Sequence, residues 1–326
     1  ITIMDTIKNI MENIMGMDEI VEILESTINK SAIKKFKSFL ERYQNIEKWF
    51  MCSDYCLKDK NKANDVITFV IFPYILDFDG WKYVINKLQR KDLKHTRKVS
   101  DEFCHFLKEG YCFSFSFILE EKNIFTNWKK REACESIIKQ YIDMTDNWQI
   151  TTPNKASGYK KMNRKLNHLY GKSKSKSFNF SLCGIVITVC FLAAYIRYLL
   201  TKEGKNIELF SWLPDRGRIT NWNDEIYREF YHITAHCMMT TILGQDYNKI
   251  HELFLKDIEK NIFYDATNRV ADYICGTYAD FNYLDGTVTR DKQCKIIEDV
   301  ISDNDNIIGI IVREKEVAQI CHYKKQ

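Results

Sequence analysis

The feature that most constrains this fold is an uncharged run of twenty residues, SFNFSLCGIVITVCFLAAYI, at positions 177–196. A run of this length can cross a bilayer, or it can form a helix that is covered on all sides by a globular core. Asn179, Thr188, two serines, two cysteines and a glycine dilute its hydrophobicity. It would also be a lone span in the middle of the chain. We therefore expect a buried helix and no membrane association, with a single-span membrane protein as the alternative.

The composition favours a large folded protein. The chain has 326 residues, of which 45% are hydrophobic and 13% aromatic, so it can bury a large core. Only three prolines and twelve glycines are present, which favours long helices with some strands over an all-β sandwich. The eleven cysteines are odd in number and irregularly spaced, and no secretory signal opens the chain. We expect reduced thiols and a cytoplasmic location.

The order of apolar patterns predicts an α/β fold. Residues 1–45 show helical spacing and are expected to form an N-terminal helical extension, and residues 46–326 are expected to form the main domain. Three adjacent strand patterns followed by strands that alternate with helices predict a mixed sheet with helices on its faces. The expected strands are 46–56, 65–74, 111–121, 206–215, 261–264 and one or two within 306–325; the expected helices are 79–92, 98–109, 124–145, 180–202, 223–243, 248–260 and 268–281.

Positive charge is concentrated in one segment of the chain. No acidic residue lies between Asp146 and Glu203, whereas ten lysines and arginines do. We expect a basic insertion at about 150–177 that binds a polyanion, because clustered cations gain affinity by releasing phosphate counterions. A solvated surface segment is the alternative. The residues expected to contact nucleic acid here are Lys160, Lys161, Arg164, Lys165, Lys172 and Lys174.

Three aspartates, remote in the sequence, are placed to meet at one edge of the predicted sheet. Asp54 ends the first expected strand, Asp215 ends the fourth, and Asp272 lies on the apolar stripe of the helix 268–281. If the first and fourth strands are neighbours, these carboxylates converge. Crowded carboxylates repel one another, and Mg²⁺ or Mn²⁺ would relieve that repulsion. Asp54 and Asp215 could instead simply cap turns after their strands.

The pieces SDYC (53–56), WLPD (212–215) and RVADYICG (269–276) resemble motifs of the RNase H-like nuclease superfamily. The likeness is to an uncharacterised, largely prokaryotic branch with Asp-Glu-Ser-Gly on strand one, an Asp closing strand four and a Gln-x-Ala-Asp final helix. The resemblance implies an RNase H-like sheet, a metal-dependent nuclease that hydrolyses phosphodiester bonds, and catalytic and metal-binding roles for Asp54, Asp215 and Asp272. It also suggests a role in prokaryotic defence.

The chain departs from that pattern at the site itself. Tyr55 replaces the second acid of strand one, and Arg269 replaces the Gln of the final helix. Asp265, or alternatively Asp224 or Glu225, is a candidate for a further metal-binding carboxylate. Arg269 suits a phosphate contact or a charge partner for Asp272.

Further expectations concern a phosphate contact, a protein partner and an alternative function. Arg216 and Arg218, beside Asp215, are expected to contact a phosphate. The N-terminal helices are a possible contact for a protein partner. A catalytically degenerate module that binds nucleic acid or a protein without cleaving remains the alternative function.

Overall fold

The computed structural model describes residues 17–244, 250–253 and 263–320, and it divides the chain into two compact units. Of the described residues, the first unit contains 17–23, 124–202 and 216–244, and the second contains 24–123, 203–215, 250–253 and 263–320. This division differs from the predicted one, because the expected boundary at residue 45 falls inside the second unit. The predicted α/β fold with a mixed sheet is confirmed.

A seven-stranded sheet lies in the second unit, with the order β5-β4-β1-β2-β3-β6-β7. The strands β1, β2 and β3 are antiparallel, β4 is parallel to β1, and β5 is parallel to β4. At the other edge β6 is parallel to β3, and β7 is antiparallel to β6. The strands are β1 (Lys48–Cys56), β2 (Asp65–Pro73), β3 (Phe113–Leu119), β4 (Leu209–Pro214), β5 (His251–Glu252), β6 (Ile307–Val312) and β7 (Val317–Ile320).

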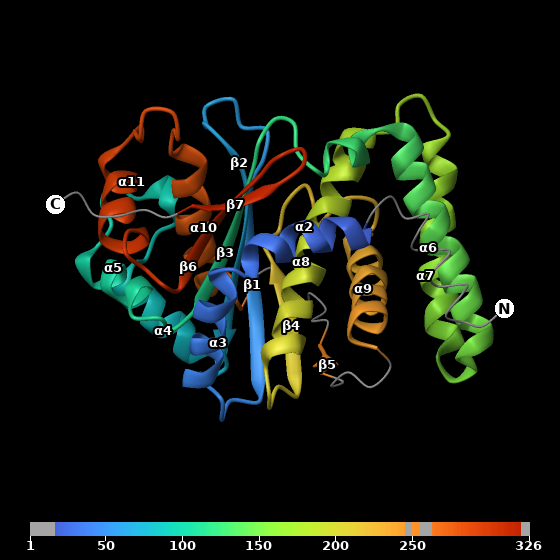
Figure 1. Ribbon diagram of the computed structural model, residues 1–326, viewed down its shortest axis with the longest axis horizontal. Helices are drawn as coiled ribbons and strands as arrows, with labels where there is room; N and C mark the ends of the chain where they lie inside the picture. The colour runs from blue at the N-terminus through green and yellow to red at the C-terminus, as the bar shows by residue number, and fades with distance from the viewer. Residues whose placement is uncertain (1–16, 245–249, 254–262, 321–326) are drawn as a thin grey trace. The chain divides into compact units, whose positions relative to one another are not determined.

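Helices cover both faces of this sheet, as Figure 1 shows. On one face α10 packs across β1, β2 and β3, and α4, α5 and α11 gather beside it. On the other face α3 packs its Phe36 against Phe113 and Phe115 of β3, with ring centroids 5.0 and 5.4 Å apart. These helices are α3 (Ala32–Arg42), α4 (Phe78–Leu88), α5 (Asp101–Lys108), α10 (Asp265–Asp280) and α11 (Asp291–Ile296), with the short 3₁₀ helix η1 (Leu93–His95) between α4 and α5.

Alternation along β1 assigns its side chains to these two faces. Phe50 and Cys52 belong to the buried cluster that α10 joins. Trp49 turns to the α3 face, where its ring lies 5.8 Å from that of Phe39. Residue 54 is therefore on the α10 face. The helix α3, which we expected in an N-terminal extension, covers the opposite face of the main sheet instead.

The first unit is helical in its described residues. Its helices are α6 (Arg131–Thr151), α7 (Ala156–Ser173), α8 (Phe180–Glu203) and α9 (Tyr227–Met238), with the 3₁₀ helices η2 (Thr126–Lys129) and η3 (Pro153–Lys155) and the π-helix η4 (Met239–Leu243). The helix α2 (Met17–Ile28) contributes residues to both units. In the second unit the π-helix η5 (Ile297–Ile301) extends α11. The basic insertion expected at 150–177 is the helix α7, which lies beside α6 (Figure 1).

The uncharged run at 177–196 forms most of α8. Among the described helices, α8 is long and apolar enough to cross a membrane, and 94% of its apolar window is buried inside the protein. Its ring contact between Phe191 and Trp128, 5.3 Å between centroids, is one of the contacts that cover it. In the structure α8 is a buried helix, as we expected from the sequence.

The fifth strand is misplaced in the sequence-based prediction. We expected it at 261–264 and a helix at 248–260, whereas β5 is His251–Glu252. Residues 245–249 and 254–262 lie outside the described residues, so the remainder of that expected helix and the first half of the expected strand are not described. A strand of two residues carries no alternation that a sequence pattern could reveal.

Candidate functional site

Asp54 lies on β1, and Asp215 directly follows the neighbouring parallel strand β4, so the two residues are adjacent. The register pairs Cys52 with Leu213 and Ser53 with Pro214, so Asp54 is level with Asp215, and the Asp215 N–H donates to the Ser53 carbonyl at 2.8 Å. Leu213 belongs to the same buried cluster as Cys52, which puts Asp215 on the α10 face with Asp54. The neighbouring strands required by the sequence prediction are therefore present.

Asp272 reaches the same face from α10. One turn further along this helix, the Cys275 thiol donates to the backbone carbonyl of Asp54 at 3.5 Å and to that of Val66 at 3.6 Å. These contacts hold α10 directly over β1 and β2. The structure thus brings Asp54, Asp215 and Asp272 together on one face of the sheet.

The three carboxylates influence one another electrostatically. Burial raises the pKa of Asp54 to about 7, with the charges of Asp272 and Asp215 as the next contributions. Burial also raises the pKa of Asp272 to about 6, and the charges of Asp92 and Asp215 add to the effect. The Leu93 N–H and Arg269 act on the pKa of Asp272 in the opposite direction. Crowding of like charges of this kind is typical of sites that bind a cation or hold a shared proton.

A hydrogen bond from η1 orients Asp272. The Leu93 N–H donates to Asp272 Oδ2 at 2.7 Å. Gly276, four residues after Asp272, makes room for this contact, because a Cβ at residue 276 would lie 2.6 Å from Leu93 Cδ2. Two residues of the RVADYICG motif therefore contribute to the same contact. Gly276 leaves room for the Leu93 side chain, and the Leu93 N–H donates to the Asp272 carboxylate.

Arg269 is buried and bonded to the protein. Its side chain is 7% exposed, and it donates to Asp92 Oδ1 at 3.0 Å and, at 2.8 Å, to both Asn86 Oδ1 and the Gln89 carbonyl. These bonds fasten α10 to the last turn of α4 and to the segment that follows it. A phosphate contact through Arg269, as we expected from the sequence, would require some of these bonds to be given up.

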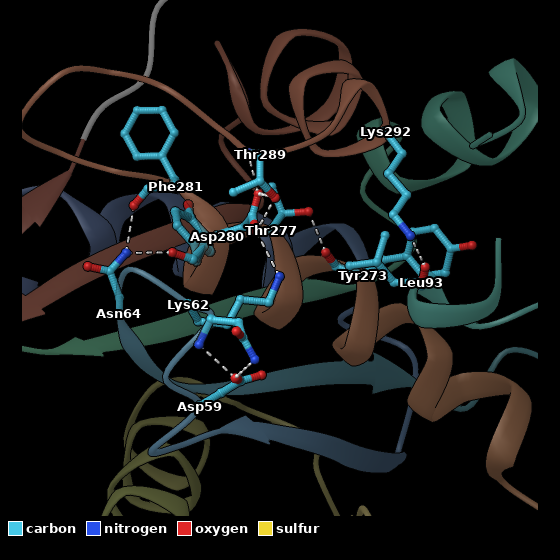
Figure 2. A network of polar contacts seen from close by, with 12 residues as sticks. Asp59, Lys62, Asn64, Leu93, Tyr273, Thr277, Asp280, Phe281, Thr289 and Lys292 are labelled. Carbon is cyan, nitrogen blue, oxygen red and sulfur yellow. Dashed lines mark hydrogen bonds and ion pairs between the residues drawn. The ribbon is translucent and has the colours of Figure 1, made fainter. Parts of the chain in front are cut away.

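The far end of α10 is fastened by the loop between β1 and β2 (Figure 2). Asn64 donates through its side chain to the carbonyls of Tyr278 at 2.8 Å and Phe281 at 2.7 Å. Lys62 pairs with Asp280 at 2.8 Å, and Asp280 also accepts the Thr289 N–H at 2.8 Å. Because this loop continues β1, it links the strand that carries Asp54 to the helix that carries Asp272.

Asp265 lies apart from the three acids. It begins α10 and is exposed, two helical turns before Asp272, which corresponds to about 10 Å along the helix axis. Asp92 is nearer, because it directly precedes Leu93 and its charge acts on Asp272. Asp92 and Leu93 were not expected as neighbours of the site, since the Leu93–Asp272 contact joins residues 179 positions apart.

Carboxylate oxygens are suitable ligands for a hard cation, but the three aspartate side chains are not arranged around a common binding position. Within the described ranges, no group of three or more His, Cys, Asp or Glu residues is placed so that it could hold a metal ion. The acids share a face and repel one another, so a divalent cation would relieve their repulsion. Binding would require the carboxylates to turn further toward a common centre.

The basic residues of α7 fall into two groups in the first unit. Lys165 pairs with Glu229 at 3.2 Å and Asp224 at 3.5 Å, Lys174 pairs with Glu135 at 2.8 Å, and Lys172 donates to Asn223 Oδ1 at 3.0 Å. The other group is exposed and forms no ion pair with any residue of the described ranges; it consists of Lys160, Lys161 and Arg164.

Arg216 and Arg218 also belong to the first unit, where Arg216 is half-buried and Arg218 is exposed.

No family model, curated protein or solved structure matches the chain. Its function is therefore argued from the geometry and charge of these residues.

Proposed function

We propose that the chain is a metal-dependent nuclease with an RNase H-like sheet, in which Asp54, Asp215 and Asp272 hold Mg²⁺ or Mn²⁺. The observation that carries this proposal is the crowding of the three carboxylates on one face of the sheet, where Asp54 has a pKa raised to about 7. The adjacency of β1 and β4, with three antiparallel strands beginning at β1, supports the RNase H-like assignment.

Each acid has a distinct support for this role. Asp54 and Asp215 are fixed by the parallel ladder of β1 and β4, so their spacing is set by the sheet. Asp272 is set by α10 and by the Leu93 N–H. When bound, the cation would polarise a phosphoryl oxygen and lower the pKa of a water molecule. The protein supplies three carboxylates on one face of the sheet, and their burial strengthens the electrostatic attraction between a carboxylate and a cation.

The proposal is tested by incubating the purified protein with labelled RNA and DNA, single-stranded and duplex, with Mg²⁺, with Mn²⁺ and with EDTA. Cleavage that depends on the metal supports the proposal. Absence of cleavage of every substrate with both metals would contradict it. The expected role in prokaryotic defence and the cytoplasmic location remain predictions.

Two observations favour a second candidate, a nucleic-acid-binding module without catalysis. The described residues include no closed metal-binding group, and Tyr55 replaces the second acid of the strand-one motif. This candidate predicts binding of nucleic acid in EDTA with an affinity equal to that in Mg²⁺, and no cleavage in either. The first candidate, a metal-dependent nuclease, predicts cleavage in Mg²⁺ and none in EDTA.

The exposed face of α7 is expected to supply affinity for nucleic acid. Replacing Lys160, Lys161 and Arg164 by Ala removes three cations that make no ion pair within the described chain. We expect binding to weaken about tenfold or more, and the slope of log K against log salt concentration to fall by about 2 to 3, because each cation releases about one counterion. Fluorescence anisotropy with a labelled strand at several salt concentrations measures both quantities.

Lys174→Ala is the matched control for that experiment. Lys174 is on the same basic segment, but its ammonium pairs with Glu135 and lies 4.0 Å from the centre of the Tyr170 ring. We expect this substitution to change the salt slope by less than the triple substitution does per charge removed. If both variants lost the same affinity per charge removed, net charge would govern binding, and Lys160, Lys161 and Arg164 would have no special role.

A further inference from the structure

Lys292 is a buried lysine beside the acid site that no sequence motif indicates. It lies on α11 and is 6% exposed. Its ammonium donates to the backbone carbonyls of Leu93 and of Thr96, the second at 3.0 Å. Figure 2 shows the Lys292 side chain reaching the Leu93 carbonyl. A buried ammonium is costly unless hydrogen bonds compensate for its lost hydration, so these two carbonyls account for its position.

The backbone C=O and N–H of Leu93 each form a hydrogen bond with a charged side chain. Its carbonyl accepts from Lys292, and its N–H donates to Asp272 Oδ2 at 2.7 Å. The same segment is held to α10 at two further points, by the Arg269–Asp92 pair and by the Tyr273 hydroxyl, which donates to the Lys91 carbonyl at 2.8 Å. Lys292 is the contact in this set that comes from outside α10.

We propose that Lys292 is a positioning residue of the acid site. Its ammonium fixes η1 through the carbonyls of Leu93, its first residue, and of Thr96, which directly follows it, and this holds the Leu93 N–H against Asp272. Lys292 acts through Leu93, and no hydrogen bond joins it directly to a carboxylate of the site. The inference rests on the proposed function, because Asp272 is taken as a metal ligand. Residues that orient metal ligands in this way change metal affinity or activity by about 10- to 100-fold when they are replaced.

The test replaces Lys292 by Met, which keeps the apolar stem and removes the ammonium. Lys295→Met is the matched control, since Lys295 is on the same helix and pairs with the exposed Asp101. Two quantities are measured in the full chain: hydrogen exchange of the Leu93 amide, by NMR, and the Mn²⁺ concentration that gives half-maximal cleavage of a labelled nucleic acid. Exchange at Leu93 requires no activity, so it reports on positioning alone.

We expect Lys292→Met to speed Leu93 exchange by about tenfold or more and to raise the half-saturating Mn²⁺ concentration by about tenfold, with Lys295→Met changing neither. Should Lys292→Met fail to fold, Lys292→Gln, which retains a donor without the charge, replaces it under the same expectation. Unchanged Leu93 exchange overturns the inference. Faster exchange with an unchanged Mn²⁺ requirement also overturns it, whereas a wild-type protein that never cleaves overturns the proposed function and the inference with it.

Discussion

Asp54→Asn is expected to lower metal-dependent cleavage by about a thousandfold or more while the protein stays folded. Asp54 lies on β1, beside Asp215 at the end of the neighbouring strand β4, and the charges of both Asp272 and Asp215 act on it. Metal-assisted stabilisation of a phosphoryl transition state contributes several kcal/mol, and about 1.4 kcal/mol corresponds to a factor of ten in rate. Single-turnover cleavage in saturating Mg²⁺ measures the loss.

Asp305→Asn is the control for this experiment. The Asp305 side chain is 78% exposed and pairs with Lys35 at the surface, where an ion pair contributes little to stability. We expect its cleavage rate to equal that of the wild-type protein. If Asp54→Asn retained more than about a tenth of the wild-type rate, Asp54 would be excluded as a metal ligand.

The same substitution should stabilise the metal-free protein above neutral pH. Burial and then the charges of Asp272 and Asp215 raise the pKa of Asp54 to about 7, so the folded protein favours the protonated carboxyl. That contribution is fully present below the unfolded pKa of about 4 and is lost as the pH rises through about 7. The amide side chain of the variant cannot ionise, so the variant avoids the loss.

We expect a gain of about 2 kcal/mol in the free energy of unfolding at about pH 8 in EDTA, and little difference at about pH 3.5, below the unfolded pKa. Urea unfolding at the two pH values measures it. A variant that is less stable than the wild-type protein at both pH values would show that Asp54 is held by favourable contacts and not crowded by like charges.

Gly184→Ala is expected to destabilise the first unit by about 3 kcal/mol. Gly184 lies on α8, and a Cβ there would lie 2.5 Å from the Trp128 carbonyl oxygen and 2.7 Å from Cα and N of Lys129. These are backbone atoms of η2, so a rotamer change cannot relieve the clash, and α8 or η2 has to move. Circular dichroism during thermal or urea unfolding measures the change.

Two other glycines give the controls for this substitution. At Gly276 the obstructing atom is Cδ2 of Leu93, the end of a flexible side chain, so we expect a smaller loss, partly offset by the better helix propensity of Ala. At Gly171 on α7 no atom lies within 4 Å of the added Cβ, so we expect a gain of up to about 1 kcal/mol. A neutral Gly184→Ala would contradict the close approach of α8 to η2.

The strands that carry the site were predictable because their side chains follow simple patterns. β2 and β3 are rich in β-branched and aromatic residues, and Phe113, Phe115 and Phe117 alternate with serines along β3. Asp54 and Asp215 each end such a pattern, and the parallel pairing of β1 with β4 then puts them level. The sheet edge at β5 was not predictable, since two residues have no period.

The surroundings of Asp272 could not be read from the sequence. Its hydrogen-bond partner Leu93 comes from a polar loop 179 residues away, and the lysine that binds the Leu93 carbonyl is 199 residues from it. Local periodicity says nothing about such distant pairs. The same limit explains why Asp265, on the same helix as Asp272, was expected as a metal ligand, whereas Asp92, which the folded chain brings nearer, was not considered.

The most direct test of the central claim is a crystal structure of the protein soaked in Mn²⁺, with anomalous scattering used to locate the ion. We expect an anomalous peak on the α10 face of the sheet, within about 2 to 2.5 Å of carboxylate oxygens from both Asp54 and Asp215 and with Asp272 in its coordination shell or one water away. No peak at that face at saturating Mn²⁺, in a crystal where all three carboxylates are well ordered, would contradict it.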